Sequence, residues 1–93
     1  MNRREETMYT QSYVIKNQTG LHARPASLFV KTANQFSSSI KVRKDDEEGD
    51  AKSIISVLTL GAGIGATISI SASGVDETEA VQSLIGLMDT FTE

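Results

Sequence analysis

The sequence has 93 residues, 39% of them hydrophobic, and a net charge of −3, values that fit one small domain with its own core. Because it has no cysteine and only one histidine, disulfides, thiolate metal sites and histidine clusters for zinc are excluded, and we expect no metal or cofactor. The negative charge argues against nucleic-acid binding, and without an apolar run of the roughly 20 residues that insert across a membrane the chain is expected to be a cytoplasmic monomer.

The chain is predicted to begin with a disordered segment and a strand. Residues 1–7 are polar and charged without a pattern, which predicts a disordered N-terminal extension before a single domain over residues 8–93. Over residues 8–16 polar and apolar side chains alternate, and Tyr13 and Ile15 share one face. A period of two is typical of a strand.

The period then changes to that of a helix and back again. Over residues 23–35 the apolar side chains recur at intervals of three and four residues, which predicts a helix. These side chains are Ala26, Phe29, Val30 and Ala33. Residues 37–44 alternate through Ile40 and Val42, which predicts a second strand.

An acidic run follows the second strand. Residues 45–50 are all acidic except Gly49, which predicts an exposed, solvated turn. A weak third strand is predicted over residues 48–51. Gly49 stands where another side chain would add packing, so we expect a loose hairpin here.

The last three elements are a short helix, a strand and a long helix. Ser53 precedes an apolar segment over residues 54–60, which predicts a two-turn helix with Ser53 at its N-cap. Residues 66–73 alternate clearly and predict a strand. Asp76, followed three residues later by Glu79, resembles a capping box before a final helix.

That final helix is predicted over residues 77–91 from its apolar positions. The order of elements is therefore β-α-β-β-α-β-α. Strands that follow one another in this order indicate an antiparallel or mixed sheet with helices on one face, which is an α+β fold.

The residues best suited to chemistry stand where the first strand gives way to the first helix. If that helix begins at Ala23, His22 is its N-cap and Pro25 lies in the first turn, where a proline removes no helical hydrogen bond. Histidine is not among the favoured N-cap residues, so its presence here favours a functional role. The alternative is an exposed loop histidine that happens to have an arginine nearby.

A helix N-terminus offers free N–H groups and positive potential to an anion. Arg24 can bind phosphate oxygens through two parallel hydrogen bonds. If the imidazole of His22 attacks phosphorus, the backbone N–H groups of Ala23 and Arg24 and the guanidinium can receive the new charge. The pattern therefore predicts a site that carries a phosphoryl group.

Three segments resemble those of one known family. Residues 20–27, GLHARPAS, resemble the active-site motif of HPr, the histidine-containing phosphocarrier of the bacterial phosphoenolpyruvate-dependent sugar phosphotransferase system. Residues 52–61 are similar to its regulatory-serine segment, and the likeness resumes over residues 68–77. The resemblance spans roughly residues 8–91. It implies an open-faced β-sandwich, in which three helices cover one face of a four-stranded antiparallel sheet.

The resemblance also implies roles for particular residues. His22 would accept the phosphoryl group through its Nδ1 (pros) atom, and Arg24 would bind it. The donor would be enzyme I, charged by phosphoenolpyruvate, and the acceptors would be enzyme IIA domains of sugar permeases. The protein would thus be a carrier and not an independent enzyme.

Ser53 has two compatible interpretations. It is a plain N-cap by propensity, and by resemblance it is the site of HPr kinase/phosphorylase, whose product would act with catabolite control protein. Of the apolar residues after it, two could belong to the core and some should stay exposed. We expect Ile54 and Leu58 to contact partner proteins.

Two other functions stay open. One is a regulatory HPr-like adapter for carbon catabolite control, although such adapters are expected to lack the histidine, which this chain keeps as His22. The other is a carrier in a non-sugar phosphorelay, which His22 and Arg24 would serve equally well. The segment around Ser53 favours the sugar branch.

Overall fold

The computed structural model describes residues 8–93, so the predicted extension of residues 1–7 lies outside the described residues. The elements follow in the predicted order. They are β1 (Tyr9–Val14), α1 (Ala23–Ala33), β2 (Ser39–Lys44), β3 (Glu47–Asp50), α2 (Ile54–Leu60), β4 (Thr67–Ser73) and α3 (Glu77–Met88). Within this part of the chain, no helix has the length and hydropathy to cross a membrane.

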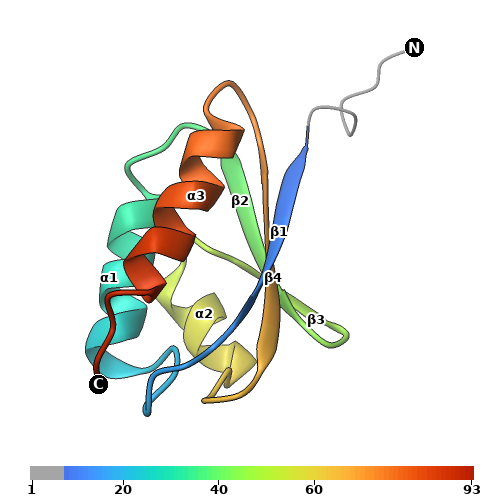
Figure 1. Cartoon of the computed structure of the whole chain (residues 1–93). Helices are drawn as coiled ribbons and strands as arrows, with labels where there is room; N and C mark the ends of the chain where they lie inside the picture. The colour runs from blue at the N-terminus through green and yellow to red at the C-terminus, as the bar shows by residue number, and fades with distance from the viewer. Residues whose placement is uncertain (1–7) are drawn as a thin grey trace.

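The four strands form one sheet in the order β1-β4-β2-β3, and every neighbouring pair is antiparallel. Of the two sheet types that the element order left open, the antiparallel one is therefore present. All three helices lie on the same side of the sheet and leave its other face open (Figure 1). The predicted open-faced α+β architecture is confirmed.

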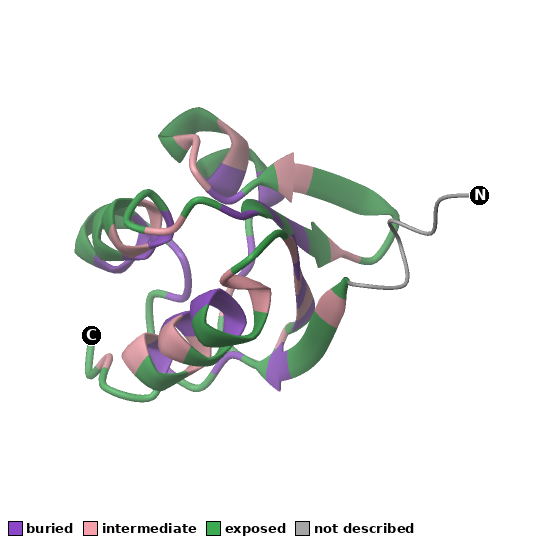
Figure 2. Ribbon diagram, turned by 90° about the horizontal axis from the view of Figure 1, so that it is seen from above, coloured by how far each residue is buried: buried purple, intermediate pink, exposed green. Residues whose placement is uncertain are grey.

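The core lies between the sheet and the helices, as the purple segments in Figure 2 indicate. Successive side chains of a strand point to opposite faces of the sheet. The apolar residues that alternate in the sequence therefore face the helices. Tyr13, Ile40 and Ile70 are buried on this face of the sheet. The helices contribute a facing set of buried side chains, which includes Phe29, Val57, Leu60, Val81 and Leu84.

Both long helices end earlier than the sequence pattern predicts. Helix α1 stops at Ala33, where the side-chain amide of Asn34 donates to the carbonyl of Val30 at 2.9 Å and so occupies an acceptor of the last turn. Helix α3 stops at Met88, and the apolar Phe91 lies in the segment after it, packed against the core.

The predicted capping box at Asp76 is wrong. The Asp76 carboxylate makes no cap hydrogen bond in α3 and instead accepts from the backbone N–H groups of Ser37 and Ser38, at 3.0 Å each. The buried hydroxyl of Ser38 donates to it as well. Asp76 thus joins the start of α3 to the segment that enters β2, because a tertiary partner outcompetes the local one.

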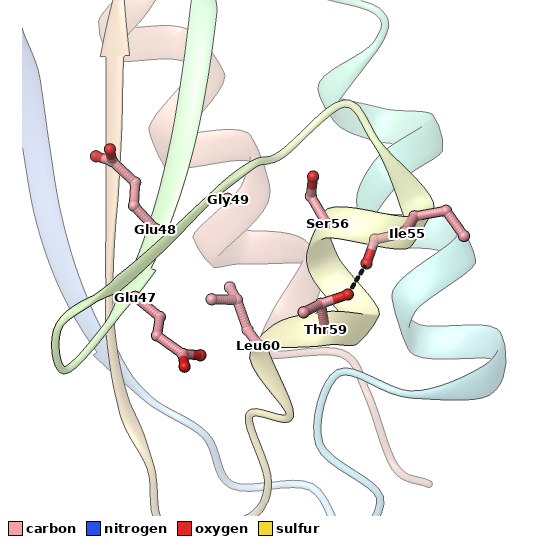
Figure 3. Close-up of a pocket in the computed structure, with 7 residues that line it drawn as sticks. All are labelled: Glu47, Glu48, Gly49, Ile55, Ser56, Thr59 and Leu60. Carbon is pink, nitrogen blue, oxygen red and sulfur yellow. Dashed lines mark hydrogen bonds between the residues drawn. The ribbon is translucent and has the colours of Figure 1, made fainter.

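The predicted third strand is confirmed as β3, which begins one residue earlier than expected, and the predicted six-residue acidic turn is therefore wrong. Lys44 pairs with Glu47, so only Asp45 and Asp46 form the turn, and Asp45 has the left-handed φ of 55° that aspartate tolerates. Gly49 does not leave a packing gap either. A Cβ atom there would lie 3.2 Å from both the Cβ and the carbonyl oxygen of Ser56, so the glycine lets α2 approach β3 closely (Figure 3).

Candidate functional site

A tightly held loop presents His22 to solvent. The backbone N–H of Leu21 donates to the carbonyl of Ala62 at 2.9 Å, and the Leu21 side chain is buried. Gly20 has a φ of 63°, and a Cβ atom there would lie 2.3 Å from the Ala62 carbonyl oxygen. Only glycine fits at a position where the backbone passes this close to the Ala62 carbonyl. The loop is therefore anchored immediately before His22, where the chain turns outward.

His22 is the N-cap of α1, as predicted. Its backbone is extended, with φ −132° and ψ 164°, and its carbonyl accepts from the N–H of Ala26 at 3.3 Å. The imidazole makes no capping hydrogen bond, and the residue is exposed. Pro25 lies in the first turn, as expected. The His22 ring is thus free to meet a partner while its backbone is fixed.

The first turn of α1 leaves donors beside this histidine. Ala23 has a φ of 50°, a conformation that non-glycine residues rarely adopt, at the point where the chain enters the helix. Pro25 has no N–H, and no hydrogen bond among residues 8–93 uses the N–H of Ala23 or Arg24. These two groups are the free donors that a helix N-terminus offers to an anion.

Arg24 lies on the surface beside an acidic partner that sequence reasoning missed. Its side chain is 72% exposed, and its Nε lies 3.4 Å from Oε2 of Glu93. No local pattern could indicate this pair, because the two residues are 69 positions apart in the sequence (93 − 24). The fold alone brings them together.

Ser53 is the N-cap of α2, as predicted, and its hydroxyl accepts from the N–H of Ser56 at 3.3 Å. The segment before it is fixed to the end of α1. The Asn34 side-chain amide donates to the carbonyl of Lys52 at 3.1 Å, and the Lys52 ammonium donates to the carbonyl of Phe36 at 2.7 Å. Ser53 therefore lies toward the C-terminal end of α1, whereas His22 is at its N-terminal end.

The exposed side of α2 is more apolar than predicted. Val57 and Leu60 fill the core, while the three other large apolar residues all reach the surface, so the alternative that two of them are core is wrong. Ile54 and Leu58 are exposed by 37% and 36%, and Ile55 by 70%. Ile55 was not among the expected contacts. The spacing of Val57 and Leu60 could have indicated it, because it lies on the opposite side of the helix.

A groove runs between β3 and α2 (Figure 3). Glu47 and Glu48 point to opposite sides of β3, and Thr59 donates its hydroxyl hydrogen to the Ile55 carbonyl at 2.7 Å. The lining residues include neither His22, Arg24 nor Ser53. The groove is therefore separate from the histidine site.

Comparison with known proteins finds HPr and HPr-like proteins throughout. The family model described as "PTS HPr component phosphorylation site" matches residues 9–90. The HPr-like protein Crh of Halalkalibacterium halodurans is 43% identical over 82 residues, which cover 88% of this chain and 98% of that protein.

Two crystal structures are similar along almost the whole domain. HPr of Thermoanaerobacter tengcongensis superposes with a TM-score of 0.86 at 48% identity, over 88% of this chain and 92% of that one. The phosphocarrier protein HPr of Bacillus anthracis gives 0.84 at 38% identity, over 86% and 95%. The fold, the matched family model and these relatives together place the chain in the HPr family of phosphotransferase-system phosphocarriers.

Proposed function

We propose that this phosphocarrier accepts a phosphoryl group from phospho-enzyme I on Nδ1 of His22 and passes it to enzyme IIA domains of sugar permeases in the cytoplasm. The observation that carries the proposal is the exposed, uncommitted imidazole at the start of α1, next to two free backbone donors and Arg24. A carrier of this kind works as a monomer and needs no cofactor of its own.

The chemistry follows from what surrounds the ring. The lone pair of the imidazole nitrogen attacks phosphorus, a phosphorus–nitrogen bond forms at His22, and the bond to the donor breaks. The N–H groups of Ala23 and Arg24 and the Arg24 guanidinium receive the phosphoryl oxygens. Because every donor is at the surface, the group stays accessible, and the same steps in reverse hand it to the next protein.

The test of this function is phosphorylation by phosphoenolpyruvate and enzyme I. Mass spectrometry should find one added phosphoryl group that is lost in acid and is absent from His22→Ala. An adduct that survives acid treatment, or one that persists in His22→Ala, would contradict the proposal.

We further propose that Ser53 is a regulatory site for HPr kinase/phosphorylase. A phosphate there would add a charge of about −1.5 to −2 at the start of α2. It would stand next to Ile54, Ile55 and Leu58, which are suited to an apolar contact with enzyme I or an enzyme IIA domain. Catabolite control protein would be the partner of the phosphorylated form.

A second candidate function is a regulatory adapter that works through Ser53 alone. The similarity to the HPr-like protein Crh favours it, whereas His22 favours the carrier. The two functions differ in one result. An adapter would gain phosphate on Ser53 from the kinase and bind catabolite control protein, but it would take no phosphoryl group from enzyme I.

A further inference from the structure

Asn17 is a buried polar residue just before the loop that carries His22. Among residues 8–93 only Asn17 and Ser38 are both polar and buried, and Asn17 is 8% exposed. Burial of a side-chain amide costs free energy unless the amide finds a hydrogen-bond partner. That partner is Gly20, because Nδ2 of Asn17 donates to the Gly20 carbonyl at 3.1 Å. The buried amide is therefore directed at the loop itself.

This hydrogen bond differs from an ordinary asparagine turn. In such a turn the side chain bonds to the backbone two residues on, whereas here the amide is the donor and its partner is three residues on. The turn is also closed by the main chain, since the N–H of Gly20 donates to the carbonyl of Asn17 at 3.2 Å. The main-chain bond would survive the loss of the side chain, so the amide must serve something besides the turn.

The amide fixes one edge of the peptide between Gly20 and Leu21. The carbonyl of this peptide accepts from Asn17, and its N–H donates to the carbonyl of Ala62 at 2.9 Å. Because a peptide is one rigid plane, it cannot rotate here without breaking one of the two hydrogen bonds. The next side chain, Leu21, is buried, and His22 follows it. The direction in which the backbone reaches His22 is therefore set by this peptide.

We propose that Asn17 is a positioning residue for phosphoryl transfer, a role that rests on the proposed phosphorylation of His22. Its amide holds the peptide that sets the place of the His22 ring relative to the free N–H groups of Ala23 and Arg24. Transfer requires the ring nitrogen and these donors to meet the phosphoryl group together, and a small displacement of reacting groups lowers the rate steeply. Because Asn17 is buried, it acts through the backbone and not through contact with a partner protein.

Asn17→Ala should slow transfer without weakening docking. The maximal rate of transfer from phospho-enzyme I should fall roughly 10- to 100-fold, because a displacement of about 1 Å costs up to about 100-fold in rate. The phospho-enzyme I concentration that gives half of this rate should stay unchanged, since the exposed apolar residues of α2 are untouched. Rapid-quench kinetics measure both quantities, at a temperature at which melting curves show every variant to be folded.

Hydrogen exchange tests the loop without any phosphoryl transfer. In Asn17→Ala the N–H of Leu21 should exchange roughly 2- to 10-fold faster, the factor that corresponds to one hydrogen bond. The N–H of Ile15, which donates to the carbonyl of Ala66 at 2.9 Å, should keep its wild-type exchange rate. This measurement decides whether Asn17 holds the loop even if enzyme I does not phosphorylate His22.

Two further variants separate positioning from a general loss of stability. Ser38→Ala removes the other buried polar side chain, whose hydroxyl donates to Asp76 beyond the C-terminal end of α1, and it should lower the melting temperature but transfer at the wild-type rate. Asn17→Asp keeps the shape but loses the donor when ionised, and it should be at least as slow as Asn17→Ala. A wild-type transfer rate in Asn17→Ala, an equal slowing in Ser38→Ala, a change confined to the half-saturating concentration, or an unchanged exchange rate of Leu21 would each overturn the inference.

Discussion

At the scale of single residues, the site depends on a few groups that the backbone holds at the start of α1. In the proposed transfer, His22 would supply the nucleophile, while Arg24 and two free backbone donors would stabilise the phosphoryl charge. The backbone donors stay when the Arg24 side chain is removed, so the two contributions can be separated by mutation.

Arg24→Ala should slow phosphoryl transfer without abolishing it. Loss of one charged hydrogen-bonding partner costs about 1.5–3 kcal/mol, which is roughly a 10- to 150-fold lower rate if the contact forms in the transition state. Rapid-quench kinetics with phospho-enzyme I would measure this. Arg43→Ala, which removes an exposed arginine from β2, is the matched control. Equal rates for Arg24→Ala and wild type would reduce Arg24 to a surface charge.

Tyr13 should titrate far above its ordinary range. Burial, followed by its hydrogen bond to the Asp89 carboxylate at 2.9 Å, raises the pKa of Tyr13 from 10.0 to about 12. A pKa that is raised by folding contributes stability that is complete below pH 10 and is lost as pH rises to about 12. Unfolding free energies of wild type and Tyr13→Phe should therefore converge over this window. A constant difference from pH 9 to pH 12 would contradict the assignment.

At the scale of elements, glycines decide how closely the loops and helices approach one another. Gly20 lies against the Ala62 carbonyl in the loop that leads to His22. Gly86 of α3, by contrast, has open space around the position of a Cβ atom. The same substitution should thus have opposite effects at the two positions.

Gly20→Ala should destabilise the fold by more than about 1 kcal/mol from its left-handed backbone alone, with the clash at Ala62 in addition. Gly86→Ala should stabilise it by roughly 0.5–1 kcal/mol, because alanine loses less backbone entropy in a helix. Denaturant melts of both variants would measure the difference. A Gly20→Ala protein as stable as wild type would mean that the loop does not cross Ala62 in this way.

The elements also show what a sequence pattern can and cannot predict. Side-chain period predicts strand faces well, since Ile40 and Val42 turn inward for a purely local geometric reason. It fails where a distant partner competes with a local one. Asp76 binds Ser37 and Ser38 instead of capping its helix, and Gly49 makes room for Ser56.

The same difference between local patterns and distant contacts applies to the candidate site. His22 and Ser53 are found at their helix starts because N-cap positions are fixed by neighbouring residues. The placement of Glu93 beside Arg24 depends on how α3 and its tail pack, which no local pattern contains.

At the scale of the whole molecule, α1 separates the two proposed phosphorylation sites. His22 begins the helix, and the segment of Ser53 is fixed to its other end through Asn34. An 11-residue helix is about 16 Å long, which exceeds the Debye length of about 8 Å in physiological salt. A phosphate on Ser53 should therefore act on a docking protein and not directly on His22.

Phosphate on Ser53 should accordingly reduce phosphorylation of His22 by enzyme I without lowering the melting temperature. A dianion among the exposed Ile54, Ile55 and Leu58 weakens an apolar contact, while the start of α2 is slightly stabilised by it. Ser53→Asp, with about half the charge, should show a weaker effect, and Ser53→Ala should match wild type in transfer. If the kinase-treated protein accepts phosphate at the wild-type rate, Ser53 is a plain N-cap.

The central claim, that the phosphoryl group is carried on the ring of His22, is tested most directly by NMR of the protein after incubation with phosphoenolpyruvate and enzyme I. Phosphorus–nitrogen couplings on ¹⁵N-labelled protein identify the bonded atom. We predict a single phosphorus signal coupled to Nδ1 of His22, which disappears in acid. A phosphorus signal without coupling to this ring, or no signal while a known HPr is phosphorylated in the same mixture, would contradict the account.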